Sequence, residues 1–310
     1  MNNKEYRPTL AQLRTFVTIA ENKHFGTAAA KLNISQPSLS QALVALEAGL
    51  GVQLIERSTR KVIVTPAGEA LLPYAKSTLD AADAFIAHAH GASGTLAGPM
   101  SIGIIPTIAP YILPWLLESV QHDYPELELR IVEDQTKHLF RQLKDGQIDC
   151  AVLALPTEQQ GLVEIPLYDE HFIMVVPHDH TFAHREDLQL ENLKDIDLLL
   201  LEDGHCLHDQ IVDLCRQVEV NPENSPLAET RAASLTTVLQ LVGAGIGGTL
   251  VPESAVSIEC TRPTIATAHF NPNVTASRKV GLVYRSSSSR GEEFHKLGTL
   301  VAGAFAKSIS

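Results

Sequence analysis

The chain lacks several features that mark whole classes of protein. Its 310 residues include four cysteines, too few for a disulfide scaffold. No apolar run reaches the roughly 18 residues that a membrane span needs, and residues 1–8 lack the apolar core of a signal peptide. The hydrophobic content of 45% is ordinary for a globular protein. We therefore expect a cytoplasmic protein without a membrane partner, whose thiols are normally reduced.

Basic residues are also scarce, since the net charge is -12, and this balance disfavours nucleic acid as a partner of the whole chain. The distribution is uneven, however. Residues 1–70 carry eight Lys and Arg against five Glu, whereas residues 71–310 carry 16 basic and 31 acidic side chains. A basic N-terminal module on an acidic body is typical of a DNA-binding head joined to a soluble sensor.

Residues 9–47 have the pattern of a helix-turn-helix. Thr9 and Gln12 form a capping-box pair before a first helix, residues 27–32 form a short helix of small side chains, and Ser35 can cap the helix that follows. At the start of that helix, one face presents small polar residues that can meet base edges in a major groove. They are Gln36, Pro37, Ser38, Ser40 and Gln41. The alternative is a generic helical bundle whose Ser and Gln face water.

Residues 52–64 form two short apolar runs around a basic turn, which predicts a β-hairpin wing. Its Arg57, Arg60 and Lys61 are placed for phosphates or the minor groove. A long helix from Pro66 to about residue 90 follows. Apolar residues recur along it in a heptad seam that asks for a partner helix and predicts a dimer. They are Leu72, Ala75, Leu79, Ala82 and Ile86.

Several of these segments together resemble the winged helix-turn-helix of LysR-type transcriptional regulators. They are residues 25–40, Leu46-Glu47, 54–57 and 65–68. The resemblance implies an α+β, multidomain protein that binds a roughly palindromic promoter as a dimer or tetramer, with RNA polymerase as a further partner. The implied domains are a DNA-binding domain at 1–65, a linker (dimerisation) helix at 66–90, a hinge at 91–98 and a regulatory domain at 99–310.

From residue 100 onward, strands and helices alternate. Strands at 101–105, 127–132 and 148–155 enclose helical segments, and this order predicts a parallel sheet. The alternation continues through strands near 173–176, 198–201 and 248–251, and a late strand at 280–285 should return to the first subdomain. We expect two α/β subdomains with a cleft between them. The resemblance implies a fold like that of periplasmic solute-binding proteins.

Cys206 is the most informative residue of this region. Four leucines at 198–201 run into an acidic turn and Gly204, and Cys206 stands where a helix should begin, a position that favours a thiolate. Cys215 follows nine residues later, roughly 13 Å along a continuous helix. A disulfide needs Cα atoms within about 7 Å, so the pair can bond only if the segment unwinds. The plainer interpretation is two ordinary cysteines in one amphipathic helix.

Two threonines also follow predicted strands. Because ligands bind at the carboxyl ends of parallel strands, Thr107, Thr136 and Cys206 can converge on one cleft. The alternative is that each threonine merely caps a helix. We interpret Cys150, in a buried strand, and Cys260, in a turn, as structural.

Four motifs sharpen the resemblance to the peroxide-sensing branch of the LysR family. They are residues 105–107, 135–136, 201–215 and 281–285. The resemblance implies that hydrogen peroxide oxidises Cys206, the peroxidatic cysteine, which then forms a disulfide with the resolving Cys215. The roles implied for the surrounding residues are peroxide binding by Thr107, Thr136 and His205, a proton relay through Asp209, and stabilisation of the thiolate by Arg285.

Three other functions compete with this one. A LysR-type regulator that answers to a small-molecule inducer would leave the cysteines inert. A metal sensor would use His205, Cys206, His208 and Cys215, but Cys215 lies far along the helix. A thiol peroxidase would turn over, which a fused DNA-binding head argues against. We expect no metal, no cofactor and no enzyme; activator and repressor, like dimer and tetramer, stay open.

Overall fold

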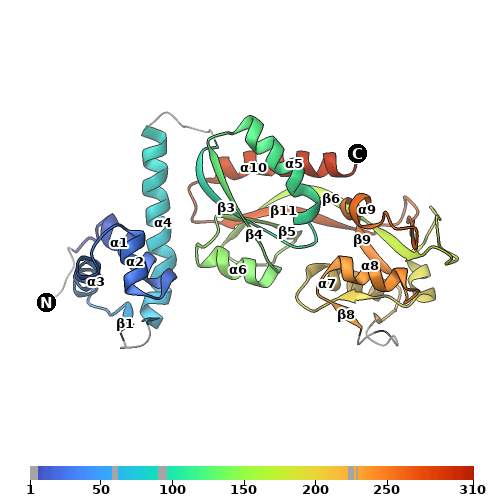
Figure 1. Cartoon of the computed structure of the whole chain (residues 1–310), viewed down its shortest axis with the longest axis horizontal. Helices are drawn as coiled ribbons and strands as arrows, with labels where there is room; N and C mark the ends of the chain where they lie inside the picture. Colours follow the sequence, from blue (N-terminus) through green and yellow to red (C-terminus); the bar gives the residue numbers. More distant parts are fainter. Residues whose placement is uncertain (1–5, 58–61, 90–95, 223–226, 228–229) are drawn as a thin grey trace. The chain divides into compact units, whose positions relative to one another are not determined.

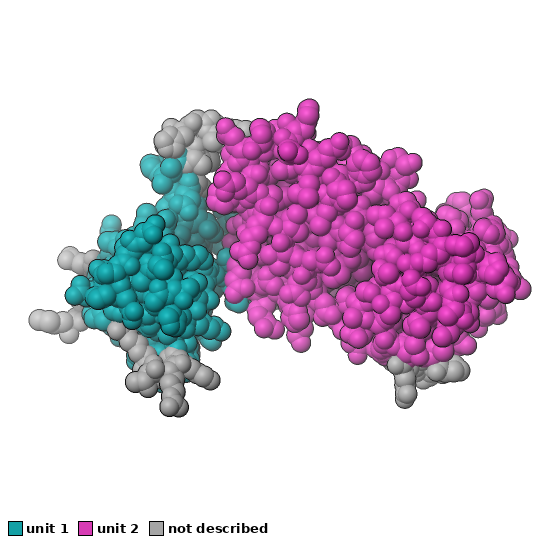
Figure 2. Space-filling view, viewed as in Figure 1, with its two compact units in different colours: residues 1–93, 144–146, 287–290 teal, residues 94–143, 147–286, 291–310 magenta. Residues whose placement is uncertain are grey.

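The computed structural model describes residues 6–57, 62–89, 96–222, 227 and 230–310. The chain divides into two compact units (Figure 2). The first contains residues 1–93, 144–146 and 287–290, and the second contains residues 94–143, 147–286 and 291–310. Within the described residues, no helix has the length and apolar character needed to cross a membrane.

The first unit begins with three helices and a short hairpin, as the sequence predicted (Figure 1). Thr9 and Gln12 form the predicted capping box, and the Ser35 hydroxyl accepts a hydrogen bond from the backbone N–H of Ser38. Both bonds satisfy N–H groups that a helix start would otherwise leave without a partner. The elements are α1 (Leu10–Asn22), α2 (Phe25–Lys31), α3 (Gln36–Leu50), β1 (Ile55–Arg57), β2 (Val62–Val64) and α4 (Pro66–Ala89).

The core of this unit joins α3 to the hairpin. Phe16, Leu39 and Leu43 are almost completely buried, and Ala28 lies among them. The Glu47 carboxylate near the end of α3 accepts hydrogen bonds from the backbone N–H groups of Leu54 (2.8 Å) and Ile55 (3.0 Å). The first strand of the hairpin is therefore held against α3.

The predicted seam of α4 is wrong in its first half. Ala75 and Leu79 are buried, and Leu72 packs with them into the core of the same unit, where α4 contacts α1. These residues therefore need no partner chain. Further along α4, Phe85 is 76% exposed and Ile86 is 53% exposed. Only this later part of the apolar stripe is open to another helix.

The second unit begins with alternating strands and helices and continues with a mixed set of elements. The first are β3 (Gly98–Ile104), α5 (Ala109–Asp123), β4 (Leu127–Glu133), α6 (Thr136–Lys144), β5 (Cys150–Leu155) and β6 (Leu162–Pro177). The others are η1 (Leu190–Asp195), β7 (Leu200–Leu201), α7 (Cys206–Gln217), β8 (Arg231–Ala232), α8 (Leu235–Gly243), β9 (Thr249–Pro252), α9 (Glu253–Glu259), β10 (Ile265–Ala268), β11 (Ser277–Arg285) and α10 (Gly291–Ser308).

The main sheet is mixed rather than parallel, which corrects the sequence-based expectation. Its order is β10-β6-β11-β5-β3-β4, with β9 also paired to β6. β3 pairs in parallel with β4 and β5, as predicted, but β11 runs antiparallel to both β5 and β6. The difference arises because β11 comes from late in the chain and inserts between two earlier strands. Periodicity predicts strands but not their direction.

Two hydrophobic cores divide the second unit into two lobes, which confirms the predicted pair of subdomains. The core of the first lobe includes Ile102, Val152 and Val283, and the core of the second includes Leu239 and Val251. β6 belongs to both, because residues 162–171 pair with β11 whereas residues 172–177 pair with β9 and β10. β11 also pairs with β5 of the first lobe, as expected of the late strand.

Gly68 of α4 offers a test of the first unit. A Cβ atom at this position would lie 2.3 Å from the backbone oxygen of Leu54 and 2.7 Å from Val64. We expect Gly68→Ala to lower the free energy of unfolding of this unit by about 1–3 kcal/mol, measured by calorimetry. The control is Gly303→Ala in α10, where a Cβ has no neighbour within 4 Å and should stabilise the helix by up to about 1 kcal/mol. Equal stability of Gly68→Ala and the unchanged protein would contradict the argument.

Candidate functional site

Cys206 is the first residue of α7, as predicted. The chain leaves β7 at Leu201, turns through Gly204 and starts the helix after His205. Gly204 has a φ of +99°, a left-handed conformation that favours glycine. A Cβ there would also lie 2.7 Å from Oε1 of Gln135. Glycine therefore lets the turn before Cys206 approach Gln135, which precedes α6 of the first lobe.

The two cysteines of α7 belong to different hydrophobic cores. Cys206 is partly buried and packs against the core of the first lobe, although its helix belongs to the second. Cys215 is fully buried in the core of the second lobe. Both are free thiols, and the helix between them is continuous. The structure is therefore that of a reduced pair whose sulfur atoms are kept apart.

The surroundings of the Cys206 thiol shift its pKa in opposite directions. Burial is the largest effect and raises the pKa, because a low-dielectric site disfavours the thiolate. The positive charge of Arg278 lowers it, as do the hydroxyls of Thr136 and Thr107, while the Asp209 carboxylate raises it. The predicted convergence of Thr107 and Thr136 on Cys206 is thus present in the structure. The thiolate preference expected from the helix start is outweighed by burial.

Arg278, which the sequence analysis missed, supplies the positive charge of the site. It lies in β11 and is 3% exposed. Its Nη1 donates to the Thr107 hydroxyl and its Nη2 to the Thr107 carbonyl, both at 2.9 Å. Thr107 therefore binds a guanidinium rather than serving only as a helix cap. No pattern singled out Arg278, because it precedes the motif at 281–285 and stands beside another basic residue, Lys279.

The position of Arg285 corrects the role predicted for it. Its Nη1 donates to the backbone carbonyls of Leu143 (2.7 Å) and Ile148 (2.8 Å), so the guanidinium joins the end of α6 to the approach to β5. The cation that acts on the Cys206 thiol is instead Arg278. Both arginines lie on β11, which explains why the sequence could point to the strand and still select the wrong residue.

Two polar oxygens near the thiol are buried without a partner. The Thr136 hydroxyl oxygen and the Gln210 side-chain oxygen make no hydrogen bond among the described residues. Gln210 lies one turn after Cys206 on α7, so both side chains project from the same side of the helix. Buried polar groups are normally paired. Thr136 and Gln210 could therefore bind a small molecule that carries oxygen atoms.

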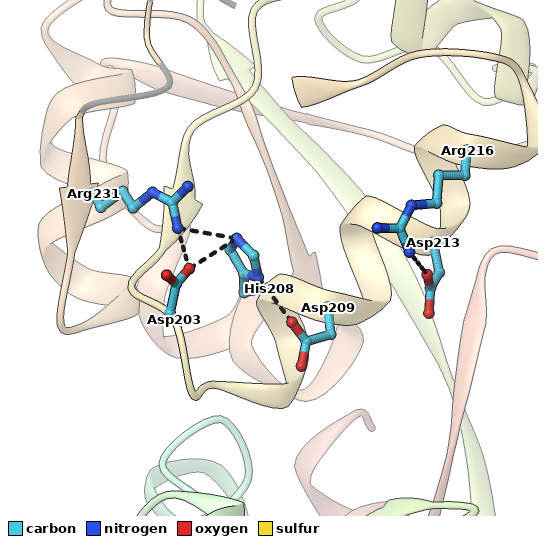
Figure 3. Close-up of polar contacts among 6 residues, drawn as sticks. All are labelled: Asp203, His208, Asp209, Asp213, Arg216 and Arg231. Atoms are coloured by element: carbon cyan, nitrogen blue, oxygen red, sulfur yellow. Dashed lines mark hydrogen bonds and ion pairs between the residues drawn. The ribbon is translucent and has the colours of Figure 1, made fainter. Parts of the chain in front are cut away.

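The two histidines beside Cys206 have different surroundings. His205 is buried, and this burial lowers its pKa, although the nearby Glu202 carboxylate opposes the effect. The imidazole of His205 is therefore neutral at neutral pH. His208 lies between two acidic side chains (Figure 3): Nδ1 is 3.0 Å from Asp209 and Nε2 is 3.5 Å from Asp203.

Arg231 completes this second group of polar residues (Figure 3). Its Nη1 pairs with Asp203 and lies 3.4 Å from Nε2 of His208. The group joins the first turn of α7 to β8, the strand that carries Arg231. Asp209, for which the resemblance implied a proton relay, is thus held by His208, and its side chain is 73% exposed.

The other cysteines lie in apolar surroundings. Cys150 is fully buried in β5. Burial raises the pKa of Cys215 to about 11 and, with the charge of Glu259, raises that of Cys260 to about 12. These thiols therefore have little thiolate at neutral pH. Among the residues that the structure describes, no cluster of three or more His, Cys, Asp or Glu could hold a metal ion.

The predicted DNA-contacting residues lie at the start of α3. Four of them, Gln36, Pro37, Ser38 and Gln41, are exposed, and Ser40 is half-buried. Arg57 ends β1, but its side chain, together with Arg60 and Lys61, falls outside what the structure describes. The recognition face of the helix is thus accessible.

Comparison with known families gives two matches. Residues 10–69 match the bacterial regulatory helix-turn-helix of the LysR family, and residues 93–306 match the LysR substrate binding domain. Among curated proteins, the chain is 47% identical over 301 residues to the "Probable hydrogen peroxide-inducible genes activator" of Mycobacterium leprae, covering 97% of this chain and 96% of that one. It is 36% identical over 294 residues to the "DNA-binding transcriptional dual regulator OxyR" of Escherichia coli, covering 94% of each.

Solved structures give the same picture. The C206S mutant of Corynebacterium glutamicum OxyR, described as H2O2-bound, is 68% identical with a TM-score of 0.70, covering 98% of this chain and 96% of that one. Full-length OxyR of Pseudomonas aeruginosa is 32% identical with a TM-score of 0.80, covering 96% and 95%. The likeness therefore extends over both units of the chain.

Substitution of the two arginines of β11 tests which one acts on the thiol. We expect Arg278→Gln to raise the pKa of Cys206, so that less thiolate is present below that pKa. A shift of one unit lowers the rate of alkylation by iodoacetamide about tenfold at neutral pH. Arg285→Gln should leave the alkylation profile unchanged and instead destabilise the fold by about 1–3 kcal/mol, because two buried carbonyls lose their donor. The reverse pattern would restore Arg285 to the role implied by the resemblance.

Proposed function

We propose that this chain, which belongs to the LysR family and within it to the OxyR branch, senses hydrogen peroxide through Cys206 and regulates transcription. The observation that carries the proposal is the site itself. A partly buried thiol faces a buried guanidinium and the hydroxyls of Thr107 and Thr136. Such a site can stabilise a thiolate and bind a small molecule with two oxygen atoms.

The proposed chemistry has two steps. The Cys206 thiolate attacks one oxygen of hydrogen peroxide, the O–O bond breaks, and the departing hydroxide takes a proton to become water, leaving a sulfenic acid on Cys206. The thiol of Cys215 then attacks the Cys206 sulfur. A second water leaves and a Cys206–Cys215 disulfide remains, with one peroxide reduced and two thiols oxidised.

The second step requires α7 to unwind. The nine residues from Cys206 to Cys215 span about 13 Å on a continuous helix, whereas a disulfide holds Cα atoms within about 7 Å. Cys215 must also leave the core of the second lobe, in which it is fully buried. Disulfide formation therefore repacks that lobe, and a repacked regulatory domain is what a redox switch needs.

The residues around the thiol have separate roles in this proposal. Thr107, Thr136 and His205 would hold the peroxide, and Arg278 would stabilise both the thiolate and the negative charge on the departing oxygen. Asp209 would take part in proton transfer together with His208, which it contacts. The neutral imidazole of His205 suits hydrogen bonding to peroxide, because one ring nitrogen donates and the other accepts.

The first unit would carry the signal to promoter DNA. The exposed start of α3 enters the major groove, and the hairpin follows the backbone. The exposed Phe85 and Ile86 of α4 would help to join two chains. The proposal further includes assembly as a dimer or tetramer in the cytoplasm, contact with RNA polymerase, and one peroxide consumed per oxidation cycle instead of enzymatic turnover.

Disulfide mapping tests the redox switch directly. After one equivalent of hydrogen peroxide, mass mapping of the full chain should show a bridge between Cys206 and Cys215. Cys206→Ser should prevent the bridge, whereas Cys150→Ser should not, because Cys150 stays buried in β5. If Cys206 stayed reduced while the protein still bound DNA, the peroxide proposal would fail and a small-molecule inducer would become the leading alternative.

DNA binding tests the first unit. A binding site would first be selected from random duplexes by the full chain. Gln36→Ala and Gln41→Ala should then each cost about 1–3 kcal/mol of binding free energy on that site, because lost base contacts reduce specificity. Affinity for unrelated DNA should change little, as it depends on phosphate contacts. The matched control is Gln240→Ala, an exposed glutamine on α8. Equal losses on both DNAs would refute base readout.

A further inference from the structure

Glu170 holds the guanidinium of Arg278 from the side away from Thr107. The two residues are direct partners in the antiparallel pairing of β6 with β11. Oε2 of Glu170 accepts from Nε of Arg278 at 2.8 Å and lies 2.7 Å from Nη2. Both side chains are almost completely buried, at 1% and 3% exposure. The ion pair is therefore part of the interior and not a surface contact.

The second oxygen of Glu170 is held by Ser254. Oε1 accepts from the backbone N–H of Ser254 at 3.1 Å and also from its hydroxyl. Ser254 is 1% exposed and is the second residue of α9. Because both oxygens of the carboxylate have partners, Glu170 has little freedom to turn, and its orientation is passed to the guanidinium it holds.

These contacts form a continuous chain from one lobe to the other. It runs from Ser254 on α9 through Glu170 and Arg278 to Thr107, which lies between β3 and α5. Glu170 stands two residues before β6 changes partners from β11 to β9. The geometry of the guanidinium at the thiol is therefore set by groups on both lobes.

We propose that Glu170 and Ser254 are positioning residues for the reaction of Cys206, acting by orienting Arg278 toward Thr107 and the thiol. The inference rests on the proposed function only in that the thiol reacts with peroxide. A planar guanidinium gains from two fixed acceptors, which define its plane as well as its place. Without Glu170, the buried cation would turn toward other acceptors or toward water, because an unpaired buried charge is strongly disfavoured.

Electrostatics and positioning predict opposite results for one substitution, Glu170→Gln. If Glu170 acted only through its negative charge, the substitution would favour the Cys206 thiolate and shift the pH profile of the thiol downward. If Glu170 orients Arg278, the substitution withdraws a stronger positive influence and shifts the profile upward. The other charged or titratable groups around the thiol, Asp209 and His205, are untouched by this change.

The experiment follows alkylation of Cys206 by iodoacetamide against pH in the reduced full-length protein, with peptide mass spectrometry to identify the modified thiol. For Glu170→Gln we expect the midpoint to rise by about one unit, which corresponds to a tenfold slower reaction at neutral pH. Ser254→Ala should shift it in the same direction by a smaller amount, about two- to fivefold in rate. The rate of oxidation by hydrogen peroxide should fall in parallel.

The matched control is Glu259→Gln. Glu259 is also a buried carboxylate of α9, but its hydrogen bonds go to Tyr111 and Thr236 instead of Arg278. Its loss should destabilise the fold without moving the midpoint. Should Glu170→Gln fail to fold, Ser254→Ala decides alone. An unchanged or lowered midpoint in the variants overturns the proposal. If the midpoint rises but peroxide leaves Cys206 of the unchanged protein reduced, the positioning role stands and the sensing function fails.

Discussion

The structure around the candidate site depends on one buried cation. Arg278 is shielded from water, so each of its donors needs an acceptor within the protein. Glu170 supplies one side and Thr107 the other, and the requirement joins β6, β11 and the turn after β3 at a single point. A lysine would not serve equally well, since its ammonium does not define a plane. The electrostatic character of the thiol site is thus inseparable from how the strands pair.

A second constraint acts in the opposite sense and keeps the two cysteines apart. The first turn of α7 is held on one side by the contacts of Cys206 with the first lobe and on the other by Asp203, His208 and Arg231. The remainder of α7 buries Leu214 and Cys215 in the second lobe. Each half of the helix thus has its own reason to stay folded, and the reduced form is stable without any bond between the sulfur atoms.

Local rules predicted much of this architecture, because they depend on neighbouring residues alone. The capping box at Thr9, the N-cap at Ser35 and the helix that starts at Cys206 were all recognisable from the sequence. Long-range pairing was not. The direction of β11 and the burial of the α4 seam against α1 depend on partners far away in the chain. The choice of Arg278 over Arg285 depends likewise on which arginine meets Glu170 across the sheet, and a single sequence carries no sign of that pairing.

The separation of the two thiols in different cores has a consequence for timing. On the proposed chemistry, oxidation of Cys206 and closure of the disulfide are distinct events, and the second waits until α7 opens. The stability of twelve helical residues then acts as a delay between them. A brief exposure can be reversed by a reductant while the helix is still wound, whereas a sustained one outlasts the delay. The fold would thereby respond to the duration of a signal as well as to its strength.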